Sequence, residues 1–276
     1  MTSTHRPRKR FGQNFLHDRG TIGRVIGAIA PMPDDPLVEI GPGRGALTVP
    51  LLQACGRVEA IEMDRDLLDG LREVCAPHGD IVLHQGDALT FDVAQCHQGA
   101  GLRLVGNLPY NISTPLIFRL LEQAELIRDM HFMLQREVVD RMIAPPGSRT
   151  YGRLSVMTQY HCQVKRLFTV APGAFHPVPA VESAIVRLTP HAPGLTSPEE
   201  AVQLARVVTE AFGQRRKTLR KTLRELVPPS AFPACGIDPG ARPEQLSLAA
   251  FRCLAAALRD ADSPEHYTGA WNRDGR

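Results

Sequence analysis

The sequence predicts an α/β fold in which a mainly parallel sheet is followed by a small all-helical domain. Through the first half of the 276-residue chain, short apolar runs alternate with helix-like segments. This alternation is typical of β-α-β units, whose strands are buried on both faces. After a Pro/Gly/Ser-rich stretch at 190–198, the apolar pattern becomes helical. We therefore expect a larger α/β domain and a smaller helical domain.

Apolar periodicity assigns the elements in chain order. A first helix is expected at 18–29. The predicted parallel strands lie at 37–40, 58–61, 81–83, 102–105 and 130–134. A helix at 153–160 precedes two β-rich runs, 162–170 and 183–188, which are expected to form an antiparallel pair on the same sheet. The later helices are expected at 199–212, 217–226 and 243–258.

These elements divide the chain into five predicted parts. They are a basic arm at 1–17, an α/β domain at 18–190, a linker at 191–198, a helical domain at 199–259 and a flexible tail at 260–276.

The basic residues are clustered rather than evenly spread. The chain carries a net charge of +3, and 43% of its residues are apolar, which excludes an intrinsically disordered chain. One basic cluster lies at 5–10 and includes Arg8, Lys9 and Arg10. In the other, six of the ten residues at 215–224 are basic. Both clusters are candidate phosphate-contacting surfaces.

The six cysteines lie far apart in the sequence, with no C-x-x-C pair and no clustered histidines. We therefore expect no metal site and no disulfide framework, and a reducing cytoplasmic location. No secretory segment follows the basic N-terminus, and no apolar run approaches the roughly 18 residues of a membrane-spanning helix. A soluble protein without a membrane partner is expected.

A glycine-rich turn follows the first predicted strand, where 39–45 reads EIGPGRG. Glycines such as Gly41 and Gly43 let the backbone turn sharply and approach a ligand closely. The G-x-G-x-G spacing favours a ligand without a pyrophosphate over NAD. The alternative is a tight strand-to-helix connection with no ligand.

Two carboxylates follow the next two strands. Glu62 can accept hydrogen bonds from both ribose hydroxyls of a nucleoside cofactor, and Asp87 can accept one from its adenine amino group. Taken singly, Glu62 can be a solvated strand-end charge and Asp87 a helix N-cap. Because the carboxyl ends of such strands line one crevice, the glycine turn and both carboxylates together predict a nucleoside-cofactor site.

The most specific motif is Asn107-Leu108-Pro109-Tyr110, which follows the fourth strand. An adenine amino nitrogen is a poor nucleophile because its lone pair is delocalised, so an enzyme must grip its two N–H groups. The Asn107 side-chain carbonyl and the Leu108 backbone carbonyl can accept those bonds, while Pro109 stiffens the turn. Tyr110 can stack on a flipped base. The alternative is a plain proline turn whose Asn caps the helix beginning near Ser113.

Four segments resemble the ribosomal RNA adenine dimethyltransferases: 10–16 (RFGQNFL), 39–45, 106–115 and 175–179 (FHPVP). The resemblance extends from about residue 8 to residue 258. Within the family, 212–219 (FGQRRKTL) is similar to the bacterial enzymes that dimethylate two adjacent adenosines in a hairpin loop near the 3′ end of 16S rRNA.

The resemblance implies a Rossmann-like class I methyltransferase domain and S-adenosyl-L-methionine as cofactor. It implies 16S rRNA in an immature small subunit as partner, and a role in small-subunit biogenesis. The residues that it implies as cofactor contacts are Asn14, Leu16, Gly41, Glu62, Asp87 and Asn107.

The segment 175–183 carries one further implied contact and one departure from the family. Phe175 is expected to cover the second face of the base, opposite Tyr110, and the alternative is a core phenylalanine. Residues 179–183 read PAVES, where the family commonly has a lysine in the second position. Ala180 therefore removes one expected charge on the RNA side without touching the chemistry.

The second basic cluster falls on the predicted helix at 217–226, where Leu219, Leu223 and Leu226 form an apolar stripe. The residues predicted to bind RNA phosphates there are Arg215, Arg216, Lys217, Arg220, Lys221 and Arg224. A merely solvated charged face is the alternative.

Three rival functions remain compatible with the motifs. A dimethyltransferase of 23S rRNA, of the antibiotic-resistance type, shares the glycine turn and the tetrapeptide, but the 215–224 cluster argues against it. A ribosome-assembly factor with secondary catalysis is a second possibility. A DNA adenine methyltransferase would need a larger target-recognition region than the helical segment supplies. We expect a monomer without a metal ion.

Overall fold

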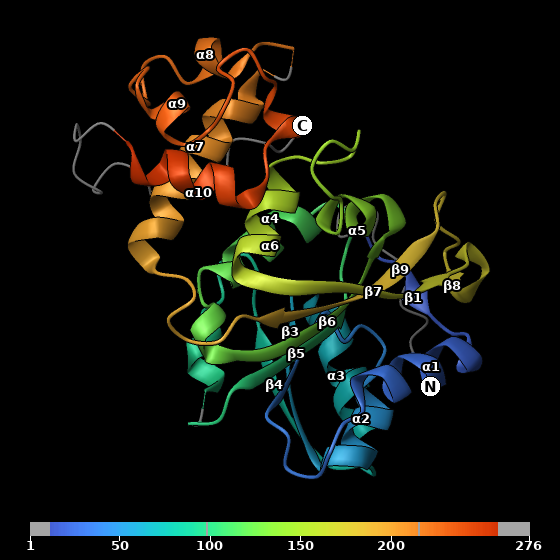
Figure 1. The fold of residues 1–276 in the computed structure, drawn as a ribbon. Coiled ribbons are helices and arrows are strands. Elements are labelled where there is room, and N and C mark those ends of the chain that lie inside the picture. The colour runs from blue at the N-terminus through green and yellow to red at the C-terminus, as the bar shows by residue number, and fades with distance from the viewer. Residues whose placement is uncertain (1–11, 98, 215, 259–276) are drawn as a thin grey trace. The chain divides into compact units, whose positions relative to one another are not determined.

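The computed structural model describes residues 12–97, 99–214 and 216–258, and the chain divides into two compact units (Figure 1). Unit 1 comprises Met1–Val139 and Val164–Pro190, and unit 2 comprises Asp140–Gln163 and His191–Arg276. The break after Pro190 coincides with the start of the predicted linker. Residues 140–163, however, group with the C-terminal helices rather than with the sheet. The five predicted parts of the chain remain a prediction.

Within the described residues, unit 1 is built on a seven-stranded sheet with the order β4-β3-β2-β5-β6-β9-β7. Its strands are β2 (Leu37–Ile40), β3 (Arg57–Glu62), β4 (Asp80–Gln85), β5 (Leu102–Asn107), β6 (Ile127–Gln135), β7 (Cys162–Val170) and β9 (Ser183–Pro190). The pairs among β2 to β6 are parallel, and β9 runs antiparallel to β6. The predicted strands are therefore confirmed, including the placement of the last two side by side on the same sheet.

The helices of unit 1 cover the sheet on both faces (Figure 1). They are α1 (Arg19–Ile29), α2 (Thr48–Cys55), α3 (Arg65–Cys75) and α4 (Ser113–Leu121), with α5 (Arg136–Met142) at the boundary of the unit. Val25 of α1, Leu51 of α2 and Leu71 of α3 pack into one core cluster with Val58 of β3. Helix α1 begins where predicted because the Asp18 side chain accepts a hydrogen bond from the Thr21 N–H (2.7 Å).

Short elements complete unit 1. The 3₁₀ turns are η2 (Val93–Cys96), η3 (Ala124–Leu126) and η4 (Pro172–Ala174). Two-residue strands β1 (Phe15–Leu16) and β8 (Phe175–His176) pair antiparallel, with Leu16 opposite Phe175. This pairing joins the N-terminal segment to the segment that precedes β9.

The strand order reverses between β2 and β5, and such reversals open a crevice at the carboxyl ends of the strands. The two strands approach closely at this point. A Cβ atom at Gly106 would lie only 2.4 Å from the Ile40 carbonyl oxygen, so glycine is required there. The segment after β5 is thereby held against the end of β2.

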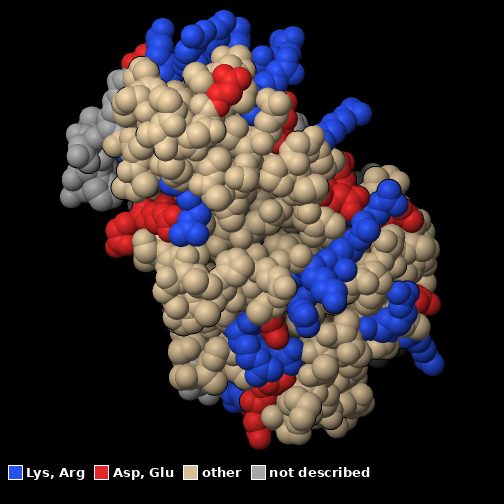
Figure 2. All heavy atoms as spheres, in the orientation of Figure 1, with Lys and Arg blue, Asp and Glu red and all other residues tan. Residues whose placement is uncertain are grey.

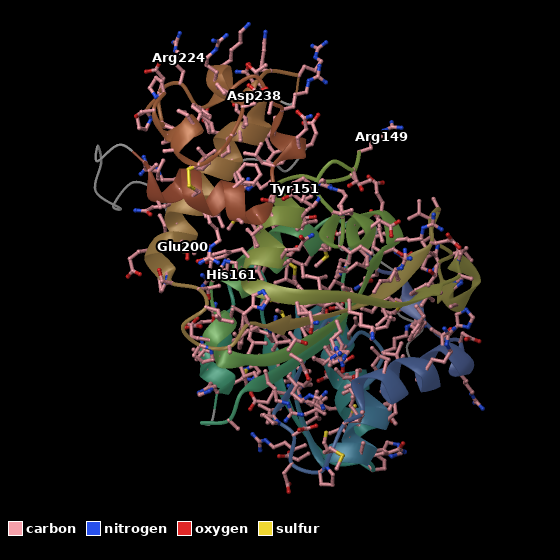
Figure 3. The ribbon with its side chains drawn as sticks, in the orientation of Figure 1. Arg149, Tyr151, His161, Glu200, Arg224 and Asp238 are labelled. Atoms are coloured by element: carbon pink, nitrogen blue, oxygen red, sulfur yellow. A yellow bond between two sulfur atoms is a disulfide. The ribbon has the colours of Figure 1, made fainter. Side chains whose placement is uncertain are left out.

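Unit 2 is helical in its described part. Its elements are α6 (Arg153–His161), α7 (Pro198–Gly213), α8 (Leu219–Thr222), α9 (Ala231–Ala234), η5 (Pro243–Gln245) and α10 (Leu248–Ala256). The rings of Tyr151 (labelled in Figure 3), Phe212 and Phe251 form its aromatic core, with centroid separations of 6.2 and 5.8 Å. Across the described ranges of the chain, no helix is both long and apolar enough to span a bilayer.

The helix predicted at 217–226 is wrong in extent, because α8 covers only Leu219–Thr222. Thr218 is extended, with φ −77° and ψ 157°, so Lys217 precedes the helix. The chain continues through a turn to Val227, which Pro228 follows, and a residue before proline is disfavoured in the helical conformation. The apolar residues of the segment still face inward, since Leu219 and Leu223 are fully buried.

The prediction of no disulfide framework is wrong for one pair. Cys235 and Cys253, which are 18 positions apart in the sequence, are joined by a disulfide, with Cα atoms 5.9 Å apart. The pairing arises from the fold of unit 2, which brings the end of α9 against α10, and no short spacing motif marks it. The free cysteines among the described residues are all buried: Cys55, Cys75, Cys96 and Cys162.

Candidate active site

A cavity of about 560 Å³ lies at the carboxyl ends of β2, β3, β4 and β5, entirely within unit 1. This volume is in the usual range for small-molecule sites. Its walls come from residues 12–17, from the carboxyl ends of the four strands and the segments that follow them, and from His176. The cavity therefore occupies the crevice at which the strand order reverses.

Every predicted cofactor contact lines this cavity: Asn14, Leu16, Gly41, Gly43, Glu62, Asp87 and Asn107. Leu108, Pro109 and Tyr110 of the predicted base-holding motif line it as well. The fold thus brings together residues that are up to 96 positions apart, from Asn14 to Tyr110. What each residue contacts in a bound ligand remains a prediction.

Glu62 holds the glycine turn in place. Its Oε2 accepts a hydrogen bond from the Gly43 N–H (3.1 Å), and its Oε1 accepts one from the Asp64 N–H (2.8 Å). Gly41 and Gly43 have positive φ values of 70° and 57°, which favour glycine. Burial raises the pKa of Glu62 above its usual range. Each carboxylate oxygen can accept a second hydrogen bond, so Glu62 can hold the loop and a ligand together.

Glu39 is a buried carboxyl group on the cavity wall, and sequence reasoning assigned it no role. Burial raises its pKa to about 7, and the negative charge of Glu62 acts in the same direction. Asp87 also lines the cavity, and its Oδ1 accepts a hydrogen bond from the Leu89 N–H (2.9 Å). Three carboxyl groups thus face the cavity beside one guanidinium, that of Arg44. This balance suits a ligand that carries positive charge.

The Asn107 side chain is oriented by the N-terminal segment. Its Nδ2 donates a hydrogen bond to the Asn14 backbone carbonyl (2.9 Å), which leaves the Oδ1 carbonyl as the acceptor end of the amide. The helix that follows is capped at Ile112 without a side-chain hydrogen bond. The alternative reading, in which an asparagine caps that helix, is therefore wrong.

The turn after Asn107 is held by its own hydrogen bonds. The Ile112 N–H donates to the Pro109 carbonyl (3.2 Å), and the Ser113 hydroxyl donates to the Tyr110 carbonyl (3.1 Å). The Leu108 carbonyl accepts neither of these bonds, while the Leu108 N–H donates to the Met133 carbonyl on β6 (3.2 Å). The motif is thus held by bonds within its own turn and by one bond to β6.

Tyr110 is half-buried, and its hydroxyl lies 2.7 Å from the Ser183 hydroxyl on β9. Burial raises the pKa of Tyr110, so the phenol keeps its proton at neutral pH. Ser183 is itself completely buried. This contact fixes the ring of Tyr110 at the cavity wall, and the PAVES segment at 179–183 was the only sequence signal near Ser183.

Among the predicted cofactor-binding and base-holding residues, Phe175 is the one that the cavity lining does not include. Its side chain is 1% exposed and packs in the core cluster of unit 1, which agrees with the alternative of a core phenylalanine. The next residue, His176, lines the cavity in its place. The contact between Phe175 and a base therefore remains a prediction that the described geometry does not support.

Sequence reasoning missed several other lining residues. They are Gln13, Phe15, Met63, Ile112 and His176. Each lies within two positions of a predicted site residue, and this proximity in the sequence was the available signal. Gln13 also donates a hydrogen bond from its Nε2 to the Asp64 carboxylate (3.0 Å), which ties the N-terminal segment to the turn after β3.

The predicted RNA-binding residues of unit 2 that the structure describes lie at its surface. Figure 2 shows Lys and Arg side chains gathered over α8, and the exposed cations are Arg216, Lys217, Arg220, Lys221 and Arg224. Arg224, labelled in Figure 3, has an acidic partner, because its Nε lies 2.7 Å from Glu225 Oε1. Arg8, Lys9, Arg10 and Arg215 lie outside the described residues. RNA binding by this cluster remains a prediction.

Comparison with known proteins identifies relatives over nearly the whole chain. The family model described as ribosomal RNA adenine dimethylase matches residues 4–258. A ribosomal RNA small subunit methyltransferase A from Pseudomonas fluorescens is 55% identical over 94% of this chain and 97% of its own length. The enzyme of the same name from Nitrosococcus oceani is 56% identical over 92% of this chain and 96% of its own length.

Solved structures agree with the fold. A dimethyladenosine transferase from Plasmodium falciparum superposes with a TM-score of 0.75 at 24% identity, covering 88% of this chain and 99% of that one. The 23S rRNA methyltransferase ErmE superposes with a TM-score of 0.70 at 27% identity, covering 89% and 99%. The predicted α/β fold, a Rossmann-like methyltransferase domain with a small helical domain, is confirmed. The chain belongs to the ribosomal RNA adenine dimethylase family.

Proposed function

We propose that this protein transfers methyl groups from S-adenosyl-L-methionine to the 6-amino groups of two adjacent adenosines in a hairpin loop near the 3′ end of 16S rRNA. The observation that carries the proposal is the Asn107 amide, which Asn14 orients at the wall of the cofactor cavity. The relatives at 55% and 56% identity, named as small subunit enzymes, favour 16S rRNA over 23S rRNA.

The cavity suits S-adenosyl-L-methionine for electrostatic reasons. The carboxylates of Glu62 and Asp87 favour its positive charge and would repel the pyrophosphate of a dinucleotide, and Glu39, whose pKa is raised to about 7, adds to both effects when it is ionised. Glu62 is positioned to accept hydrogen bonds from ribose hydroxyls, and Asp87 to accept one from the adenine amino group. When bound, the cofactor supplies an electrophilic methyl group on a sulfonium that departs as a neutral thioether.

The turn after β5 supplies the grip on the target base. The Asn107 Oδ1 and the Leu108 carbonyl accept hydrogen bonds from the two N–H groups of the adenine amino nitrogen, which favours a pyramidal nitrogen with a directed lone pair. Tyr110, held by Ser183, stacks on the flipped base, a contact worth about 1–3 kcal/mol.

The reaction needs no dedicated general base. Alkylation leaves a positively charged nitrogen, which is acidic enough to release a proton to water. After the first transfer one N–H remains, so a single acceptor of the pair is sufficient to orient the nitrogen for the second methyl group.

The exposed cations of unit 2 contact the phosphates around the hairpin loop in this proposal. The enzyme acts as a cytoplasmic monomer on an immature small subunit and contributes to small-subunit biogenesis.

The decisive experiment compares substrates. The protein is incubated with radiolabelled S-adenosyl-L-methionine and either small-subunit particles that lack the modification or 23S rRNA, and dimethyladenosine is mapped in the products. We expect label at two adjacent adenosines near the 3′ end of 16S rRNA and none with Asn107→Ala. Label on 23S rRNA alone would replace this proposal with the resistance-type activity.

A second readout addresses the rival role as an assembly factor. Binding of the Asn107→Ala protein to immature particles is measured beside its methyl transfer. Retained binding without methylation would separate the two roles. A cell that needs only the binding of the protein to immature particles would then be rescued by this variant.

A further inference from the structure

Three side chains with metal-binding atoms meet in unit 1: Glu59 on β3, His84 on β4 and Cys96 in η2. One ligand atom from each lies within 4.8 Å of the other two. His84 Nε2 is 2.8 Å from Glu59 Oε2 and 3.9 Å from Cys96 Sγ. The described lining of the candidate active site includes none of them. The cluster is therefore a separate feature.

The sheet register explains how two of the three residues meet. β3 and β4 are parallel, with Ile61 opposite His84 and Glu59 opposite Val82. Residues two positions apart on a strand share one face, so Glu59 and His84 project diagonally across the same face. Cys96 arrives from the segment after β4. Because the three positions are separated by 25 and 12 residues, no short motif announces the cluster in the sequence.

The cluster is shielded from water. Glu59 is 9% exposed and Cys96 is 3% exposed, while the His84 side chain is 25% exposed. Burying a carboxylate is costly unless it is compensated. Arg57 offers only a distant contact, with its Nη2 3.7 Å from Glu59 Oε1. Glu59 Oε2 is directed instead at His84.

We propose that Glu59, His84 and Cys96 form a Zn²⁺ site. Zinc binds thiolate sulfur at about 2.3 Å and imidazole nitrogen or carboxylate oxygen at about 2.0–2.2 Å, so tetrahedral donors lie about 3.3–3.6 Å apart. The two separations of 2.8 and 3.9 Å bracket that range. Side-chain shifts of about 0.5 Å therefore bring these two pairs of donor atoms to zinc-binding separations, and the donor atoms of Glu59 and Cys96 lie within 4.8 Å of each other.

The donor set selects the class of metal. A thiolate, an imidazole and one carboxylate are the ligands of Zn²⁺ and of its spectroscopic substitute Co²⁺, whereas Mg²⁺ and Ca²⁺ require mainly oxygen ligands. A water molecule is the fourth ligand, and it reaches the ion beside the partly exposed side chain of His84. The His84 ring packs against Phe91, with centroids 5.1 Å apart, and this contact orients the imidazole.

The ion links three elements. It would join β3, β4 and η2, and His84 precedes the Gly86-Asp87 turn of the cofactor cavity by two residues. The consequence is structural: the bound ion stabilises the edge of the sheet that carries Asp87. Burial raises the pKa of the Cys96 thiol to about 12, and its hydrogen bond to Glu59 acts in the same direction, so zinc binding must displace the thiol proton.

The test uses the full-length protein after treatment with a chelator. It is titrated with Co²⁺, and the thiolate-to-cobalt charge-transfer band and the visible ligand-field bands are recorded. Zn²⁺ is then added to displace Co²⁺, and the thermal unfolding temperature is measured with and without Zn²⁺. These readouts do not depend on methyl transfer or on its substrate.

The variants are Cys96→Ser and His84→Gln, with Cys162→Ser and His97→Gln as matched controls from outside the cluster. We expect one Co²⁺ per chain with a charge-transfer band, and a higher unfolding temperature with Zn²⁺. Cys96→Ser should lose the band, His84→Gln should bind at least tenfold more weakly, and the controls should match the unmodified protein.

Two results would overturn the proposal. One is the absence of a thiolate charge-transfer band in the unmodified protein, which would leave the trio as a hydrogen-bonded cluster only. The other is a band that Cys96→Ser retains, which would assign the metal to another cysteine. Circular dichroism of each variant confirms folding, and His84→Gln decides the case if Cys96→Ser does not fold.

Discussion

The cavity of unit 1 and the basic segment of unit 2 present polar groups in opposite ways. At the cavity each group is held: Glu62 by two backbone N–H groups, Asn107 by Asn14, and Tyr110 by Ser183. In the segment at 216–224, the cations are exposed on one helical turn and its flanks. A group held by hydrogen bonds contributes through its fixed position relative to the ligand. Exposed cations contribute through their total attraction for phosphates, which salt screens.

The largest effect is expected from Asn107→Ala. Removing the oriented acceptor should lower kcat by about 100- to 1000-fold, as for other preorganised hydrogen-bond groups in active sites. Single-turnover methyl transfer to unmodified small-subunit particles measures it. The control is Gln53→Ala, which removes an exposed side-chain amide on α2 outside the cavity lining. A loss in kcat of less than fivefold for Asn107→Ala would show that the oriented Asn107 acceptor is not needed for fast methyl transfer.

A smaller effect, on stability, is expected from the buried carboxyl group of Glu39. Its pKa is raised from the ordinary 4.5 to about 7, so the folded protein loses stability as pH rises from about 4.5 to about 7, and the loss then levels off. Glu39→Gln cannot ionise and escapes that loss. Its unfolding free energy relative to the unmodified protein should therefore rise by up to about 3 kcal/mol over this interval.

Urea unfolding of the cofactor-free protein between pH 4 and pH 8 measures the Glu39 effect. Glu73→Gln, at an exposed position of α3, controls for the loss of a carboxylate. If the difference in unfolding free energy between Glu39→Gln and the unmodified protein does not change with pH, the pKa of Glu39 is not raised in the folded protein.

Charge reversal in unit 2 should produce a more modest effect that depends on salt. The double variant Arg216→Glu/Arg220→Glu should weaken RNA binding by about tenfold or more and lower the slope of log K against log salt by about 2. Cofactor affinity should not change. The control is Arg65→Glu/Arg72→Glu on α3, which changes net charge equally at side chains that are 80% and 57% exposed. Equal RNA affinity in both double variants would remove the proposed RNA surface.

The smallest effect is expected from Ser183→Ala, which removes the partner of the Tyr110 hydroxyl. One hydrogen bond is worth about 0.5–1.5 kcal/mol, so kcat/KM should fall by about two- to tenfold. Tyr110→Phe removes the same bond from the other side. The double variant should lose no more than the larger single loss, and additive losses would mean that the two hydroxyls act independently.

Much of the fold could be predicted from the sequence because the strands of a parallel sheet are continuous apolar runs. The strands predicted at 37–40 and 162–170 match β2 and β7 residue for residue, and the other predicted strands are extended by a few positions. The helix predicted at 217–226 is longer than α8 because the leucines of this segment keep a helical period through the turn that follows α8. Periodicity reports which side chains face inward, and it does not report hydrogen bonding.

The candidate site was predictable for a similar reason. Gly41, Glu62 and Asp87 follow successive strands, and strand ends in a parallel sheet converge whatever the intervening helices are. The contacts that sequence reasoning missed depend on pairings between distant segments. Cys235 with Cys253, and Ser183 with Tyr110, meet only after chain segments have packed, and no local pattern encodes either pair.

Glu62 has a consequence for how such proteins can change over evolutionary time. One carboxylate holds the Gly43 N–H and the Asp64 N–H, so the shape of the glycine turn and the place offered to a ribose depend on the same side chain. A substitution at 62 therefore alters two functions at once, and neither can drift alone. Both donors are backbone N–H groups, which every residue except proline supplies, so this double dependence constrains position 62 itself and not the side chains at 43 and 64.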